Sequence, residues 1–178
     1  MPFQRPVLGQ QDGKGPATFD FLGFTLHGRR TRGGRWRLAC KTRRARLGRA
    51  IQAVYAWCRG QRHEEVAVQH AGLRSRWQGH SNYFGVNGNQ RSLACLGWHA
   101  RRAWYKWLNR RSQRTRWTWE RFQDLLRDFP LPNPRVMVRI WGGGTARRDH
   151  GGAGWWKSPC PDLRGPRLGN WPGLLDLA

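Results

Sequence analysis

The chain has 178 residues, which is enough for a single domain with one modest hydrophobic core. Its 33 lysine and arginine residues outnumber its 10 aspartate and glutamate residues, so the formal net charge is +23 at pH 7. A charge of this size repels itself unless a polyanion neutralises it, and nucleic acid is therefore the expected partner. Twelve tryptophans argue against a generally disordered chain. No apolar run approaches the roughly 18 residues of a membrane span, so no membrane partner is expected. The four cysteines stand far apart and form no C-x-x-C pair, which favours a reducing, cytoplasmic setting.

The first elements expected along the chain are an irregular lead-in and a β-hairpin. Residues 1–17 carry proline and glycine without any period, which is typical of irregular structure. Residues 18–41 contain short alternating apolar segments on both sides of an arginine-rich turn at 28–34, and this pattern predicts the hairpin. Thr42 is then predicted to cap the first helix.

Residues 42–141 are expected to form three to four helices, because apolar residues recur there with the helical period. Asn89 is expected to cap the third helix and Thr118 the fourth. The predicted apolar stripes are Leu47, Ile51, Val54, Tyr55 and Cys58; Val66, His70, Leu73, Trp77, His80 and Phe84; Leu93, Leu96, Ala100, Trp104, Trp107 and Leu108; and Phe122, Leu125, Leu126 and Phe129. Residues 142–178 are rich in glycine and proline and are expected to be a disordered tail. The predicted fold class is mainly α, a helical bundle preceded by a β-hairpin.

The basic faces of the first and third predicted helices are the candidate nucleic-acid surface. Arginine forks onto phosphates, and tryptophan or tyrosine between the arginines can stack on bases. The alternative for a single arginine run is a solvated helix face, and the net charge of +23 favours nucleic acid. Tryptophans at helical spacing, such as Trp77, Trp104 and Trp107, are favoured as core residues. The candidate phosphate contacts are Arg43, Arg44, Arg46, Arg49, Arg101, Arg102, Lys106, Arg110 and Arg111.

No catalytic centre, cofactor site or metal site is predicted. The acidic residues do not form the adjacent pair that would hold two metal ions, and the common phosphate-loop and hydrolase motifs are absent. The four cysteines are far apart, and Cys95-x-x-x-His99 lacks further ligands nearby. His80 is favoured as an interior or capping histidine over a ligand. The sequence therefore favours a binding module over an enzyme.

Several short motifs follow one another along residues 13–141. They are T-F-D-F-L-G-F at 18–24, K-T at 41–42, G-H-x-x-Y-F-G-V-x-G-N at 79–89, W-Y-K-W-L-x-R-R-S-Q at 104–113 and T-W-E-R-F at 118–122. This series resembles the C-terminal part of bacterial group II intron reverse transcriptases. The motif residues that carry the resemblance are Phe21, Leu22, Gly23, Phe24, Gly79, His80, Tyr83, Gly85, Trp104, Tyr105 and Trp107.

The resemblance implies a palm–thumb junction at 18–41, with the Phe-Leu-Gly-Phe motif as a strand, and a helical thumb or maturase (X) domain at 42–141. In that family these helices bind the intron RNA and assist its splicing. The implied partners are structured group II intron RNA and DNA at the target site. The family's polymerase palm, with its Tyr-Ala-Asp-Asp metal site, lies upstream of the position of Thr18. We therefore expect a fragment without polymerase activity of its own.

Three alternatives are kept beside this interpretation. The chain could be the C-terminal part of a split reverse transcriptase that acts with a separate palm-containing polypeptide. It could be a non-functional remnant of such a gene. A generic basic protein, such as a ribosomal or nucleoid component, would show no preference for folded intron RNA.

Overall fold

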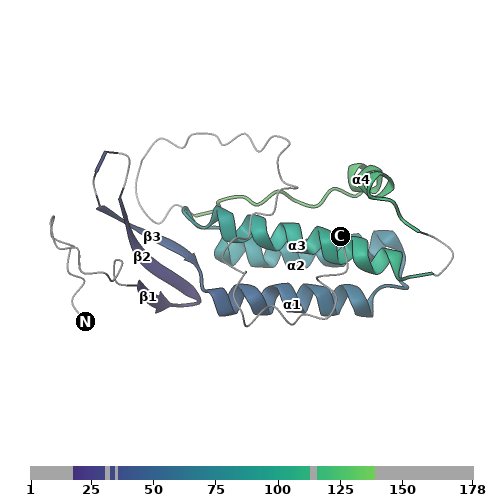
Figure 1. Ribbon diagram of the computed structural model, residues 1–178, viewed down its shortest axis with the longest axis horizontal. Coiled ribbons are helices and arrows are strands. Elements are labelled where there is room, and N and C mark those ends of the chain that lie inside the picture. Colours follow the sequence, from purple (N-terminus) through teal and green to yellow (C-terminus); the bar gives the residue numbers. More distant parts are fainter. Residues whose placement is uncertain (1–17, 31–32, 35, 113–115, 139–178) are drawn as a thin grey trace.

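The computed structural model describes residues 18–30, 33–34, 36–112 and 116–138. The predicted lead-in at 1–17 and the predicted tail at 142–178 lie outside these residues. Within them, three strands come first and four helices follow, as Figure 1 shows. The prediction of a mainly α chain with its strands at the N-terminal side is confirmed at this level. No helix in the described ranges is long and apolar enough to cross a membrane.

The strands form a three-stranded antiparallel sheet in the order β1-β2-β3. They span Thr18–Phe21 (β1), Phe24–Arg30 (β2) and Trp36–Thr42 (β3). The prediction of a single hairpin over 18–41 is therefore corrected to a meander of two hairpins. The sequence pattern does not separate β1 from β2, because only two residues lie between their apolar segments.

The Phe-Leu-Gly-Phe motif is a turn, and the expectation of a strand is wrong. Phe21 ends β1 and Phe24 begins β2, and the two face each other in the register. The backbone of Leu22 has a φ of 47° and that of Gly23 a φ of 83°. Positive φ at both central residues is the geometry that matches the twist of a two-residue hairpin. Glycine adopts this conformation without cost, whereas leucine does so rarely.

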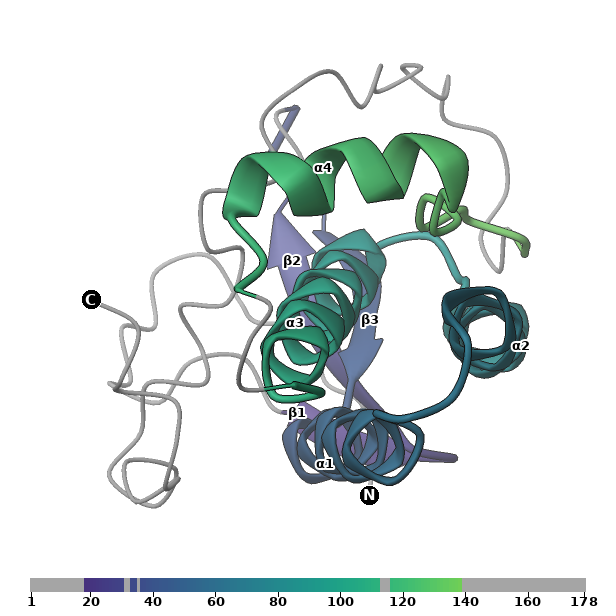
Figure 2. The ribbon, with the colours of Figure 1, turned by 90° about the vertical axis from the view of Figure 1, so that its right-hand side faces the viewer.

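The four helices span Arg44–Gly60 (α1), Val66–Phe84 (α2), Gln90–Asn109 (α3) and Trp119–Asp128 (α4). Figure 2 views α1, α2 and α3 nearly end-on, with α4 running crosswise on the side of α3 that faces away from α1. Thr118 caps α4 as predicted, because its hydroxyl accepts a hydrogen bond from the Arg121 backbone N–H at 3.3 Å.

The core lies between the helices and consists largely of the predicted stripes. Its most buried large side chains include Trp104, Phe122 and Leu93, at 1%, 0% and 0% exposure. Trp77 is also buried, so the core assignment of Trp77 and Trp104 is confirmed. Trp107 is partly exposed at the edge of the core.

A buried asparagine joins the sheet to the helices. Asn89 is fully buried, and its Oδ1 accepts a hydrogen bond from the Thr42 backbone N–H at 2.7 Å. Its Nδ2 donates to the Phe84 carbonyl and to the Thr42 hydroxyl, each at 2.8 Å. Thr42 is thus the last residue of β3 and not a helix cap, which corrects that prediction. Asn89 does stand before α3, but its side chain makes no capping bond.

The segment after α4, which we call the strap (residues 130–138), returns to the turn between α2 and α3. The backbone N–H groups of Met137 and Val138 donate to the Gly85 carbonyl at 2.6 and 3.0 Å. Val138 also forms a parallel bridge with Val86. A Cβ at Gly85 would clash with the Ser81 carbonyl of α2 and would lie 2.9 Å from the Arg135 carbonyl of the strap. Glycine at this position therefore allows the strap to approach the turn closely.

Candidate nucleic-acid interface

Positive charge is concentrated in the sheet and the first helix. Residues 21–63 contain twelve lysine and arginine residues and no aspartate or glutamate. Between described residues there are two ion pairs, Arg43–Asp20 at 3.0 Å and Arg127–Asp124 at 2.8 Å. Most of the positive charge in 21–63 thus has no carboxylate partner within the described part of the chain.

The first four candidate contacts lie at the end of α1 that adjoins the sheet. Arg44, Arg46 and Arg49 are exposed on its first two turns, and Arg43 precedes the helix. Arg43 is held beside β1 by its ion pair with Asp20. Arg46 and Arg49 are three residues apart and share one flank of the helix, whereas Arg44 lies on nearly the opposite side. The four arginines therefore do not form one continuous binding face.

A cluster of cationic side chains around one tryptophan lies at the other end of the bundle, and its residues come from α1 and α3. The guanidinium groups of Arg59 and Arg110 lie 5.9 and 5.7 Å from the centre of the Trp107 ring. The Lys106 ammonium lies 6.0 Å from the same ring. We call Arg59, Lys106, Trp107 and Arg110 the Trp107 cluster. It arises because α1 and α3 run parallel, each followed by a reversal, so their C-terminal turns meet (Figure 1).

The cluster continues as a row along α3. Arg102 lies one turn before Lys106, and its guanidinium is 4.7 Å from the centre of the Trp98 ring. Residues 98, 102, 106 and 110 are spaced by four and share one flank of the helix. This row presents aromatic and cationic groups together, the combination that binds phosphates by charge and bases by stacking.

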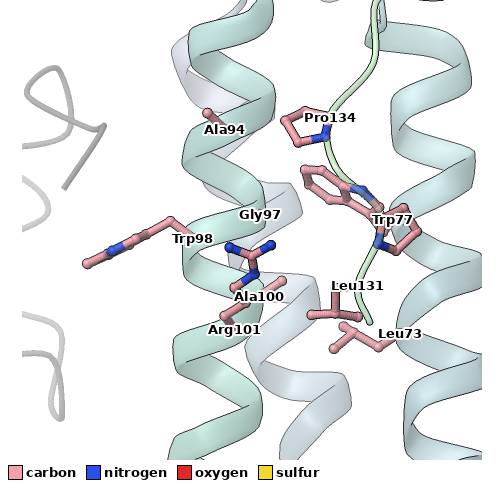
Figure 3. Close-up of a pocket in the computed structure, with 10 residues that line it drawn as sticks. Leu73, Trp77, Ala94, Gly97, Trp98, Ala100, Arg101, Leu131 and Pro134 are labelled. Carbon is pink, nitrogen blue, oxygen red and sulfur yellow. The ribbon is translucent and has the colours of Figure 1, made fainter. Parts of the chain in front are cut away.

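Two of the predicted contacts are directed away from this row. Arg101 lines a small cavity between α2, α3 and the strap, where Trp77 and Leu131 are its neighbours (Figure 3). Burial lowers the pKa of Arg101 from its ordinary value. Arg111 donates a hydrogen bond to the His63 carbonyl at 3.1 Å and so ties the end of α3 to the α1–α2 connection.

Sequence reasoning missed Arg59. It is four residues after Tyr55, on the flank of the α1 stripe, and no arginine run draws attention to it. Only the packing of α1 against α3 brings it to Trp107. The one signal in the sequence was the position of Arg59 in the last turn of α1, where the helix dipole stabilises a positively charged side chain.

Several motif residues make contacts between the sheet and α2, and others make contacts among the helices. The Tyr83 hydroxyl donates to the Leu22 carbonyl at 3.0 Å, and the Phe24 ring lies 5.1 Å from that of Phe84. The Trp104 indole N–H donates to Gln69 Oε1 at 2.9 Å within the core. Further along, the Tyr105 hydroxyl donates to the Trp117 carbonyl at 2.9 Å. These contacts give the motif residues structural roles in this chain.

Two histidines lie near arginines of the candidate surface, His80 partly buried and His99 buried. Burial, with the nearby charge of Arg46, lowers the pKa of His80 to about 4. Burial, with the charge of Arg102, likewise lowers the pKa of His99 to about 4. The His80 ring stacks on Phe84 at 4.5 Å, which fits the interior role predicted for it. Both rings are therefore neutral in the folded protein near pH 7.

This gives a pH dependence of stability. His99 has an ordinary pKa of 6.5 and a folded pKa of about 4. Its contribution to stability is therefore complete above about pH 6.5 and is lost as the pH falls toward 4. We expect the urea midpoint to fall over this range, and to fall less in His99→Gln, which cannot take up the proton. Urea unfolding at pH 7 and at pH 4.5 checks this. An equal fall in both proteins would contradict it.

The described part of the chain contains no group of three or more histidine, cysteine, aspartate or glutamate side chains that could hold a metal ion. In comparisons with known proteins, no family model, no curated protein and no solved structure matches the chain. The assignment of a function therefore depends on the geometry above and on the motifs in the sequence.

Proposed function

We propose that this chain is an RNA-binding domain of the maturase type, which binds structured group II intron RNA and assists its splicing without catalysing a reaction itself. The observation that carries the RNA-binding part is the Trp107 cluster with its continuation along α3. There two helices place Arg59, Lys106 and Arg110 around one indole ring. Neither of the two ion pairs between described residues involves Arg59 or Arg110.

The physical argument for a polyanion is the concentration of positive charge. Gathering cations around one ring costs free energy through their mutual repulsion, and the electron-rich face of the indole offsets only part of this cost. A phosphate backbone removes the remainder and releases its own counterions. The partly exposed Trp98 and Trp107 rings add surfaces on which an unpaired base can stack.

The choice of group II intron RNA as the partner is supported by the motif series at 18–24, 79–89 and 104–122, which resembles the thumb and maturase region of the intron-encoded reverse transcriptases. Folded RNA offers both elements that the surface can use, namely phosphates at fixed positions and unstacked bases in loops. DNA at the target site is a second polyanion that the same arginines can bind.

The Trp107 cluster and its continuation along α3 are tested together with the triple variant R59Q/R102Q/R110Q. Phosphate contacts contribute roughly 0.7–0.9 each to the slope of log affinity against log salt. We expect the slope for folded intron RNA to fall by about 2 to 3. Between about 50 and 200 mM salt each contact is worth about threefold, so the ratio of wild-type to variant affinity should be roughly 30-fold larger at the lower salt concentration. The matched control R74Q/R116Q/R127Q removes the same charge from α2 and the α4 region. Equal losses in both triple variants would overturn the assignment of the cluster.

The kind of RNA is tested by salt titration with three ligands. They are folded intron RNA, an unstructured RNA of the same length and a duplex DNA. A preference for the folded intron that persists at high salt is the expected result, because charge alone binds all three. Equal affinities that fall together with salt would overturn the maturase part and favour a generic basic protein or a remnant.

A further inference from the structure

The end of the β2–β3 hairpin carries arginines that do not belong to either helix surface. Arg29 and Arg37 are direct partners in the antiparallel register, and Arg30 is the partner of Trp36. All three arginines are exposed. In Figure 1 this end of the hairpin extends away from the helices, at the end of the molecule opposite to the Trp107 cluster.

The pairing places three cations on one face of this hairpin. Partners in a sheet share a face, and every second residue along a strand returns to that face. Arg29 and Arg37 therefore share a face with Lys41, the partner of Thr25. On the opposite face, the Arg30 guanidinium lies 5.2 Å from the centre of the Trp36 ring. We call Arg29, Arg37 and Lys41 the arm site.

The carboxylate nearest to the arm site in the described sheet is already engaged. Asp20, on the same face, accepts a hydrogen bond from Thr25 at 2.6 Å and pairs with Arg43 at 3.0 Å. Like charges directly opposite each other weaken a pair of strands. The direct pairing of Arg29 with Arg37 thus costs stability in the free protein, and a bound anion would remove that cost.

We propose that the arm site is a second nucleic-acid contact, which binds the phosphodiester backbone of a duplex. The face offers charge with little stacking surface, because the other side chains around Arg29, Arg37 and Lys41 are Thr18, Thr25, His27 and Ala39. Proteins that grip single strands use aromatic platforms, whereas a two-stranded β-ribbon is narrow enough to lie along a duplex groove. The inference rests on nucleic acid being the partner, and it does not require that the partner be an intron.

The test uses the full chain with Arg29→Gln and Arg37→Gln together. The ligands are a blunt duplex RNA, a duplex DNA of the same length and one separated RNA strand. For a duplex we expect the slope of log affinity against log salt to fall by about 2, because each lost phosphate contact removes roughly 0.9. For the single strand we expect no change beyond that of the control R74Q/R116Q, which removes the same charge elsewhere.

Each result supports or overturns the arm site. A loss on duplex RNA, on duplex DNA or on both supports it and identifies the backbone that it binds. A loss no larger than that of R74Q/R116Q, or an equal loss on the single strand, overturns it. The melting temperature without nucleic acid should stay the same or rise in R29Q/R37Q, since a like-charge pair is removed. If R29Q/R37Q weakens binding to a duplex while R59Q/R102Q/R110Q binds as the unchanged protein does, the arm site is supported and the assignment of the Trp107 cluster is overturned.

Discussion

Replacement of Asn89 by alanine is expected to lower the free energy of unfolding by about 3 kcal/mol or more. The side chain is fully buried and holds the Thr42 backbone N–H, the Thr42 hydroxyl and the Phe84 carbonyl. A buried polar group that loses its partner costs roughly 1–3 kcal/mol, and alanine leaves both backbone groups without this partner. The substitution also leaves a cavity at the junction of β3, α2 and α3.

Urea unfolding of the free protein measures this loss. Asn82→Ala is the matched control, because Asn82 is exposed on α2 and accepts one hydrogen bond from Gln78 at 2.8 Å. We expect this control to change stability by no more than about 0.5 kcal/mol. Similar losses in the two variants would show that the sheet is not held on the helices through Asn89.

Replacement of Gly85 by alanine is expected to detach the strap and to cost about 2–4 kcal/mol. A methyl group here would meet the Ser81 carbonyl and would come within 2.9 Å of the Arg135 carbonyl. Both obstacles are backbone, so a rotamer change cannot relieve them. The N–H groups of Met137 and Val138 would then lose the Gly85 carbonyl.

A second motif glycine supplies the control. Gly79 lies inside α2 with open space where a methyl group would stand, so Gly79→Ala should raise stability by about 0.5–1 kcal/mol. Thermal unfolding gives both changes, and hydrogen exchange at Val138 reports whether the strap has been released in Gly85→Ala. A protected Val138 amide in a stable Gly85→Ala protein would contradict the prediction.

The helices can be predicted from the sequence because the apolar pattern of each helix involves only residues close together in the chain. Each stripe repeats within a single helix, and burial follows it from Leu47 to Phe122. The role of Thr42 is not predictable, because its partner Asn89 is 47 residues away and either residue alone has the composition of a cap. The meander looks like a single hairpin in the sequence because Leu22 and Gly23 form a turn too short to separate two apolar segments.

The candidate site likewise contains residues that the sequence could predict and residues that it could not. Arg102, Lys106 and Arg110 belong to one predicted helix, and their common flank follows from the spacing of four. The sequence does not indicate that Arg101 turns into a cavity, that Arg111 binds the His63 carbonyl or that Arg59 joins Trp107 from another helix. These positions depend on how neighbouring segments pack against each other, and the apolar period within a single helix does not determine that packing.

Helix α1 acts as a spacer of fixed length. It begins just after the sheet that carries the arm site and extends to the last turn with Arg59, and its 17 residues correspond to a length of about 25 Å. The Asn89 contacts fasten the sheet to α2 and α3, so the spacing does not vary as a flexible linker would allow. A nucleic acid that occupies both surfaces must present two backbone segments at least this far apart. The protein would thus select nucleic acids by size. Binding at one surface would raise the effective concentration of the nucleic acid at the other surface only when its two backbone segments are separated by a matching distance.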